Sequence, residues 1–339
     1  MKRIISVVLM LLVSTSLFAK ESYRVAWSHY TGWEPWGYMQ DSGVLKKWAD
    51  KYGIEIKLTL VNDYIESINL YTSGTFDAVT VTNMDALTIP AVGGVDSTAL
   101  IIGDFSNGND GLLAKNAESV KALKGREIKL VMLSVSHYML ARALDMNGLK
   151  ERDVKLVNTS DADIASIFMT DDNGAIVTWN PPLSQAKAAK GAKVLFDSSK
   201  IPGEIIDMML VKTDADEKLK KALCGAWYET LKEMKSKKMI TYMAKASAAS
   251  VPEFEAQLKT TKMFYKPNAA VAFTQSDDLK KTMRMVRDFS FEKGLFGEGA
   301  SDANFIGVSY PDGSVLGSKK NVKLRFDDTY MKMAAEGKL

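Results

Sequence analysis

The sequence predicts an α/β protein of two lobes with a hinged cleft between them. Short apolar strands alternate with amphipathic helices from residue 23 to residue 213, which is typical of sheets covered by helices. The alternation of strands and helices pauses near residues 105 and 207. The chain after residue 19 has about 320 residues, which exceeds the usual size of a single hydrophobic core. We therefore expect lobe 1 to comprise residues 20–104 and 208–339, and lobe 2 to comprise residues 105–207.

The expected elements of lobe 1 come first along the chain. Asp63 is an N-cap candidate, and Gly53 and Gly74 are typical helix stops. The strands are expected at 23–27, 54–61, 76–81 and 97–105, with helices at 42–53, 63–74 and 84–94.

In lobe 2 the same alternation of strands and helices predicts strands at 111–116, 126–133, 155–160, 175–179 and 193–199. It predicts helices at 120–123, 136–148, 161–174 and 181–191. Such repeats predict parallel sheets with helices on both faces. A strand at 208–213 follows, and then amphipathic helices at 214–236, 238–248, 251–264 and 277–293. We expect these last helices to pack on lobe 1.

Residues 1–19 have the pattern of a signal peptide. Lys2 and Arg3 precede an apolar run from residue 4 to residue 13, and small residues lead to a cleavage site after Ala19. The apolar run is shorter than the roughly 20 residues of a membrane span. We expect a soluble, exported protein.

The net charge argues against a nucleic-acid-binding protein, and the cysteine content excludes an intrachain disulfide. The formal net charge of +3 falls to +1 when Lys2 and Arg3 are removed (3 − 2 = 1), so no basic face for nucleic acid is expected. The single cysteine, Cys224, has no intrachain partner for a disulfide, and its helical neighbours indicate a buried position.

Ligands of open parallel sheets bind beyond the carboxyl ends of the strands, so the segments after predicted strands are the candidate binding segments. None of them contains Lys or Arg, whereas several contain Trp, Tyr, Asp or Glu. Aromatic faces and carboxylates suit a cation or a neutral molecule rich in N–H donors. These segments are 27–38, 80–86, 104–111, 133–138, 178–184 and 201–207.

The most aromatic candidate segment, WSHYTGWEPWGY at 27–38, is interrupted by Gly32, Pro35 and Gly37. We expect a loop here, with Trp27 in the core and with Trp33 or Trp36 in the cleft. The predicted ligand-binding residues are Trp33, Glu34, Trp36, Thr82, Asn83, Asp85, Asp110, Ser136, His137, Trp179, Asn180 and Asp207.

Several of these residues have a structural alternative that the sequence leaves open. Glu34 suits a solvated surface, Asp85 a helix cap, and Asp104 and Asp110 a turn; His137 suits a helix start. No GxSxG, P-loop or HExxH motif occurs, and two His and one Cys offer little material for a metal site. We expect no enzyme activity, no metal and no cofactor, with an exported enzyme as the alternative.

Four segments carry a family resemblance: AWSHYTGWEPWGY, NDYIESINLYTSGTFDAVTVTNMDAL, GDFSNGNDG and TWNPPLSQA. They resemble the substrate-binding proteins of nitrate/sulfonate/taurine-like ABC importers. Within that family they resemble the branch described as urea transporters associated with urea carboxylase. The resemblance implies a two-lobed, type II-like periplasmic binding protein, expected as a monomer, that delivers a ligand to an ABC permease and its ATPase.

The resemblance also implies urea or a relative as cargo, and guanidinium is the rival because the carboxylase of that pathway is often regarded as acting on guanidine. Candidate segments with carboxylates and aromatic rings but no basic side chain favour guanidinium, which offers only donors, a charge and a flat face. Taurine or another sulfonate, a pyrimidine precursor of thiamine, and a sensing role stay open.

Overall fold

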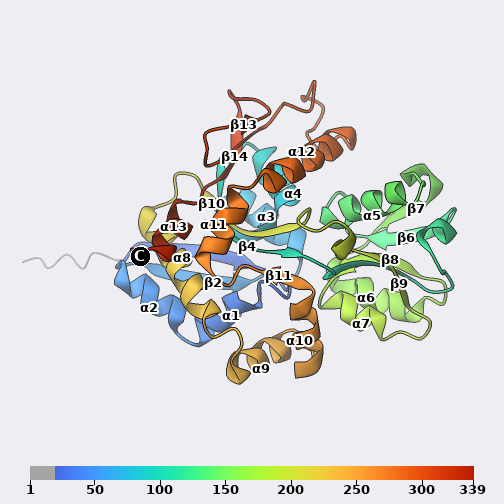
Figure 1. The fold of residues 1–339 in the computed structure, drawn as a ribbon, viewed down its shortest axis with the longest axis horizontal. Helices are drawn as coiled ribbons and strands as arrows, with labels where there is room; N and C mark the ends of the chain where they lie inside the picture. The colour runs from blue at the N-terminus through green and yellow to red at the C-terminus, as the bar shows by residue number, and fades with distance from the viewer. Residues whose placement is uncertain (1–19) are drawn as a thin grey trace, which may run out of the picture.

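The computed structural model describes residues 20–339 and confirms a two-lobed α/β architecture (Figure 1). The predicted signal peptide lies outside the described residues. No helix in the described part of the chain is both long and apolar enough to cross a membrane.

The first lobe contains a sheet of nine strands in the order β13-β12-β14-β4-β10-β3-β1-β2, with β11 paired to β4. Its strands are β1 (Ser22–Trp27), β2 (Glu55–Leu60), β3 (Ala78–Thr82), β4 (Ser97–Ser106), β10 (Ile206–Lys212), β11 (Thr261–Met263), β12 (Gly307–Ser309), β13 (Val315–Leu316) and β14 (Val322–Phe326). Its helices are α1 (Glu34–Asp41), α2 (Val44–Lys51), α3 (Tyr64–Thr72), α4 (Asn83–Ala86), η1 (Leu87–Ala91), α8 (Glu217–Leu231), α9 (Lys237–Ala246), α10 (Val251–Lys259), α11 (Pro267–Thr274), α12 (Asp277–Glu292) and α13 (Thr329–Ala335).

The second lobe contains a sheet of five strands in the order β7-β6-β8-β5-β9. Its strands are β5 (Asp110–Ala114), β6 (Glu127–Leu130), β7 (Lys155–Asn158), β8 (Ala175–Trp179) and β9 (Lys193–Asp197). Its helices are η2 (Val120–Leu123), α5 (Val135–Met146), η3 (Glu151–Asp153), α6 (Asp161–Thr170), α7 (Pro182–Lys187) and η4 (Ser198–Lys200).

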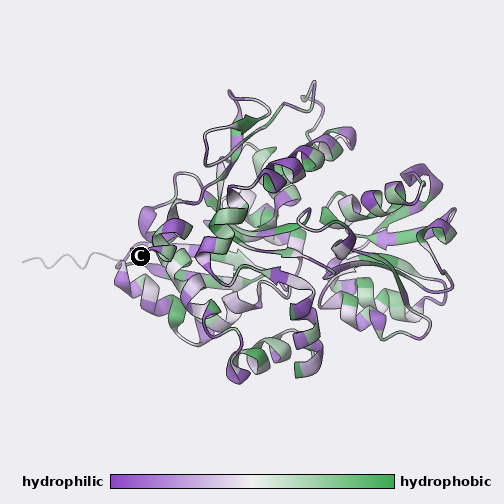
Figure 2. Cartoon of the chain, viewed as in Figure 1, coloured by the Kyte–Doolittle hydropathy of each residue, from purple (hydrophilic) through white to green (hydrophobic). Residues whose placement is uncertain are grey.

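Both faces of the second sheet are covered because successive side chains of a strand point to opposite faces. Leu112 packs in the cluster that includes α5, whereas its neighbour Leu113 packs in the cluster that includes α6 and α7. Figure 2 shows mainly hydrophobic residues on β8, and both hydrophobic and hydrophilic residues on α12. The buried side of α12 includes Leu279, Met283 and Val286, at the spacing of one helical face.

The sheets are mixed, so the prediction of parallel sheets was partly wrong. β1, β2 and β3 pair in parallel, but β10 runs antiparallel to both β3 and β4, and β5 runs antiparallel to β8 and β9. Both β5 and β10 directly follow a segment in which the chain passes from one lobe to the other. Apolar runs in sequence do not reveal strand direction, which explains the error.

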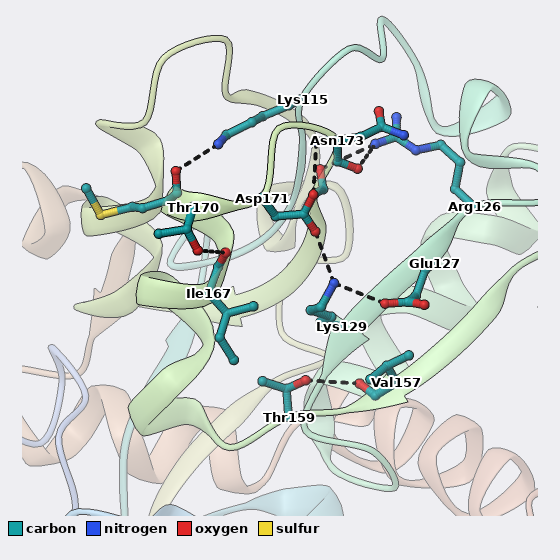
Figure 3. A network of polar contacts seen from close by, with 12 residues as sticks. Lys115, Arg126, Glu127, Lys129, Val157, Thr159, Ile167, Thr170, Asp171 and Asn173 are labelled. Atoms are coloured by element: carbon teal, nitrogen blue, oxygen red, sulfur yellow. Dashed lines mark hydrogen bonds and ion pairs between the residues drawn. The ribbon is translucent and has the colours of Figure 1, made fainter.

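A surface network stabilises the outer end of the second lobe, away from the first lobe. Lys129 on β6 forms ion pairs with Glu127 at 3.0 Å and with Asp171 at 3.1 Å, and Arg126 donates to the backbone oxygen of Asn173 (Figure 3). Asp171 and Asn173 precede β8, whereas Trp179 lies at the other end of that strand. The network therefore lies at the opposite end of β8 from Trp179.

The two lobes contact each other directly. The side chains of Val131, Tyr138 and Trp179, from the second lobe, belong to the buried cluster of the first lobe. At the rim, Ser160 at the start of α6 donates to Asp63 at the start of α3 at 3.1 Å. The structure is therefore a closed arrangement of the lobes.

Candidate functional site

A small cavity lies between the lobes, at the edge of the first sheet where several strands end. About 10 Å³ of it is open to the centre of a water molecule, which is roughly the room that a single water needs. Its lining residues are Tyr30, Trp33, Tyr64, Thr82, Asp110, Val135, Trp179, Ile205 and Asp207. Among these described residues none is basic.

Strand register brings the polar lining residues together. Asp207 on β10 lies opposite Thr82 on β3 and opposite Asp104 on β4, and Asp110 on β5 lies opposite Trp179 on β8. Directly opposite residues of antiparallel strands have Cβ atoms about 5 Å apart. The ends of five strands from two sheets therefore lie close to the cavity.

Four aromatic rings form a continuous group along the cavity. Trp33 makes an edge contact with Tyr30 at 5.1 Å between ring centroids and a tilted contact with Tyr64 at 5.7 Å. Tyr64 in turn meets Trp179 of the second lobe edge-on at 5.5 Å. The indole N–H of Trp33 is buried and has no hydrogen-bond partner.

Four buried carboxyl groups lie in or next to this lining: Asp110 and Asp207 line the cavity, Asp104 lies opposite Asp207 in strand register, and Asp85 accepts from the lining residue Thr82. Asp85, Asp104, Asp110 and Asp207 each have one oxygen that is buried without a hydrogen-bond partner. The Tyr30 hydroxyl donates to Asp104 at 3.1 Å. A Cβ on Gly32 would stand 2.3 Å from an Asp104 oxygen, so the backbone at residue 32 approaches this carboxyl as only glycine permits.

Burial makes these acids hold protons more strongly than usual. It raises the pKa of Asp85 to about 6 and the pKa of both Asp104 and Asp110 to about 7. Burial and the adjacent Asp104 raise the pKa of Asp207 well above its ordinary value. Buried charges without partners are costly, so the group favours a positively charged occupant or retained protons.

Of the predicted site residues, Trp33, Thr82, Asp110, Trp179 and Asp207 line the cavity. Asp85 lies directly behind it and accepts hydrogen bonds from Tyr64 at 2.7 Å and Thr82 at 2.8 Å. Thr82, rather than Asp85, is the N-cap of α4. Ser136 lies next to the lining residue Val135, and its hydroxyl is buried without a partner.

The other predicted residues have structural partners and do not line the cavity. Asn83 accepts a hydrogen bond from the backbone N–H of Ile206, and the Asn180 side chain donates one to Asn109. Both side-chain amides are therefore hydrogen-bonded to residues at the segments that connect the lobes. His137 pairs with Glu151 at 3.1 Å, and Glu34 pairs with His29 at 2.7 Å. Whether any predicted residue contacts a ligand stays a prediction.

The prediction of a loop over the aromatic segment was wrong for its second half: residues 28–33 form no helix or strand, but helix α1 begins at Glu34. Pro35 occupies the first turn, where a missing N–H costs nothing. A Cβ on Gly37 would lie 2.9 Å from the Trp27 ring, so this glycine permits close packing. Trp36 lies outside the cavity and stacks on Trp227 at 4.9 Å in the core.

Replacing Trp33 and Trp36 by Ala is expected to separate binding from stability. Trp36→Ala should lower the free energy of unfolding by about 3–5 kcal/mol, because it empties a core position. Trp33→Ala should weaken ligand binding more than Trp36→Ala does, because Trp33 lines the cavity. Denaturant unfolding and calorimetric titration measure the two effects; equal loss of affinity in both variants would contradict this assignment.

Sequence reasoning missed Tyr30, Tyr64, Val135 and Ile205. Tyr64 begins α3, the helix that follows β2, so the carboxyl-end rule applied equally to its segment, which was not among the candidate segments. Tyr30 lies within the candidate segment 27–38. Val135 and Ile205 are apolar, and nothing in the sequence distinguishes them from core residues.

Comparison with known proteins places the chain in a family. Residues 46–221 match the profile described as NMT1/THI5 like. The chain belongs to the NMT1/THI5-like family. Within residues 20–339 of this NMT1/THI5-like chain, no group of three or more His, Cys, Asp and Glu residues has the geometry of a metal site.

Relatives of the NMT1/THI5-like chain include proteins named for sulfonates. An aliphatic sulfonates-binding protein of Escherichia coli (strain K12) is 33% identical over 90 residues, which span 26% of this chain and 28% of that protein. The crystal structure of the periplasmic aliphatic sulphonate binding protein SsuA from Escherichia coli matches with a TM-score of 0.67 at 19% identity, covering 83% of this chain and 95% of the other.

The alkanesulfonate-binding protein SsuA from Xanthomonas axonopodis pv. citri, bound to MOPS, also matches with a TM-score of 0.67. Its identity is 16%, covering 83% of this chain and 96% of the other. These structural similarities support the two-lobed periplasmic binding protein fold of the NMT1/THI5-like chain.

Proposed function

We propose that this chain is the periplasmic solute-binding component of an ABC importer and that its ligand is guanidinium. The importer role is supported by family membership, by the two-lobed fold and by the names of its relatives. The signal-peptide pattern of residues 1–19 supports the proposed export to the periplasm. The family resemblance implies a permease and an ATPase as partners.

The observation that carries the ligand assignment is a cavity lined by two buried carboxyls with unpartnered oxygens, Asp110 and Asp207, and by no cation, with two further buried carboxyls next to it. A buried carboxylate is stabilised by a charge-assisted hydrogen bond, and guanidinium supplies several donors in one plane. Trp33 and Trp179 line the cavity, and a ring face in contact with the cation would contribute about 0.5–2 kcal/mol. In this structure the cavity has room for about one water, so guanidinium, with its four heavy atoms, requires the lining residues to move apart.

Urea is the second candidate, and one observation favours it. The buried indole N–H of Trp33 has no partner, and the carbonyl oxygen of urea would accept from it, whereas guanidinium has no acceptor. Urea also offers N–H donors to the carboxyl oxygens. It would, however, leave the negative charge of the site uncompensated.

Calorimetric titration of the purified chain with guanidinium chloride, urea and ethanesulfonate, each at millimolar or lower concentration and equal ionic strength, tests the assignment. Sodium chloride is the matched control for salt. We expect guanidinium to bind most tightly and ethanesulfonate to give no heat of binding. Tighter urea binding would replace guanidinium by the second candidate. Ethanesulfonate binding without a guanidinium response would overturn the cation assignment.

A further inference from the structure

Helix α12 extends from the first lobe toward α5 of the second lobe (Figure 1). The Thr282 hydroxyl donates to the backbone oxygen of Gly203 at 2.9 Å, so this part of the helix lies beside a segment that connects the lobes. Lys293, the C-cap residue, follows eleven residues later (293 − 282 = 11), which is about 16 Å along a helix axis. There the Lys293 ammonium pairs with Glu151 of the second lobe at 2.8 Å. A hinge motion at the connecting segments therefore separates these two charges.

Aromatic contacts between the lobes accompany this ion pair. The Phe289 ring of α12 meets Tyr138 edge-on at 5.2 Å between ring centroids and His137 edge-on at 5.8 Å, both from α5. The Lys293 ammonium lies 5.6 Å from the centroid of the same Phe289 ring. The side chains of Lys293 and Glu151 are only 20% and 22% exposed, so water and salt screen this pair less than a fully exposed one.

The second lobe holds the Glu151 carboxylate in position independently of Lys293. His137 Nδ1 accepts from the backbone N–H of Leu133 at 3.2 Å, so the hydrogen of the neutral ring is on Nε2, which donates to Glu151 at 3.1 Å. This hydrogen-bond chain begins two residues before Val135, which lines the cavity. Because Glu151 is fixed in place, less side-chain freedom is lost when Lys293 reaches it.

We propose that Lys293 and Glu151 form an interlobe latch that favours the closed form of this chain, with or without ligand. The ion pair joins the two lobes and exists only when they are closed, so it adds to the free energy of closure. The apparent affinity for any ligand of the closed cavity rises with the population of the closed form. The inference goes beyond the proposed function, because it does not depend on which ligand the cavity binds.

The alternative is a surface ion pair that contributes nothing to closure. Lys293→Met and Glu151→Gln separate the two roles, because each removes the ion pair and nearly preserves the size of the side chain. The Gln oxygen still accepts from His137.

Lys280→Met is the matched control, because Lys280 lies on the same helix and has the same kinds of contact within the first lobe alone. Its ammonium lies 5.6 Å from the centroid of the Tyr310 ring and pairs with Asp312 at 2.5 Å. Its side chain is 21% exposed, close to the value for Lys293.

Small-angle X-ray scattering of the ligand-free chain measures closure, and calorimetric titration with guanidinium chloride and urea, each at millimolar or lower concentration, measures binding. We expect a larger radius of gyration for Lys293→Met and Glu151→Gln than for wild type and Lys280→Met. Both latch variants should bind each ligand of the wild-type chain about threefold to tenfold more weakly, by the same factor for each ligand. The double variant should bind no more weakly than either single variant, because the two residues act as one pair.

An unchanged radius of gyration in both latch variants, or the same increase in Lys280→Met, would overturn the latch. A changed ratio of the guanidinium and urea affinities would also overturn it, since the effect would then lie in the cavity and not in closure. If wild type binds neither guanidinium nor urea, the proposed function fails, and the scattering of the ligand-free variants still decides whether the latch exists.

Discussion

Asp110→Asn is expected to weaken guanidinium binding by at least about 30-fold. Asp110 lines the cavity, is buried, and has one oxygen without a partner in the described structure. Removing one member of a buried, hydrogen-bonded charge pair costs about 2–5 kcal/mol. Asn has the same shape and keeps one acceptor, so the loss reports mainly the charge. Calorimetric titration at pH 7.5 measures it.

The matched control for Asp110→Asn is Asp171→Asn, whose guanidinium affinity should remain within about threefold of wild type because surface ion pairs contribute little. Urea provides a second comparison, since a neutral ligand should lose only about 1 kcal/mol, the net value of one ordinary hydrogen bond. An unchanged guanidinium affinity in Asp110→Asn would remove this carboxyl from the proposed site.

The sequence predicts part of the site because the carboxyl ends of parallel strands share one edge of a sheet. Thr82 and Trp179 end β3 and β8, and Trp33 lies in the segment after β1, so all three line the cavity for the expected reason. Asp110 and Asp207 begin their strands instead. They reach the same edge because β5 and β10 run antiparallel to their neighbours, and strand direction is not visible in hydrophobic periodicity.

Tertiary packing explains two features that the local sequence pattern did not predict, the helix that begins at Glu34 and the role of Asp85. Glycine and proline in the segment 27–38 favour a loop locally, yet burial of Trp36 against Trp227 and the close approach of Gly37 to Trp27 stabilise a helix. The hydrogen bonds of Asp85 likewise depend on tertiary packing and cannot be inferred from its local sequence. Its sequence position suits a helix cap, whereas its side chain accepts hydrogen bonds from Thr82 and from Tyr64 of the neighbouring helix α3.

Guanidinium affinity is expected to rise with pH between about 5 and 7. Burial raises the pKa of Asp104 and Asp110 to about 7, and burial with the adjacent Asp104 raises the pKa of Asp207 further. A bound cation favours the ionised carboxylates, so binding releases protons while these acids are still protonated. Each released proton corresponds to about a tenfold gain in affinity per pH unit.

The stability of the ligand-free protein should change in the opposite direction. Asp ionises near pH 4 in the unfolded chain, whereas the folded chain holds these protons up to about pH 7. The folded state therefore binds more protons in this window, so the contribution of these acids is fully present below about pH 4 and is lost as pH rises through 7. Thermal unfolding should show a falling melting temperature from pH 5 to pH 8, and a larger stabilisation by guanidinium at pH 8 than at pH 5.

Urea and ethanesulfonate distinguish proton-linked cation binding from a general effect of pH on the fold. A neutral ligand releases no proton on account of charge, so urea affinity should change little, and an anion would bind better at low pH. Titration of guanidinium in two buffers of different ionisation enthalpy counts the released protons directly. A guanidinium dissociation constant that is flat from pH 5 to pH 8, with no proton release, would mean that these carboxyls do not hold the ligand. Asp110→Asn removes one of the acids that titrate here, and should therefore reduce the slope as well as the affinity.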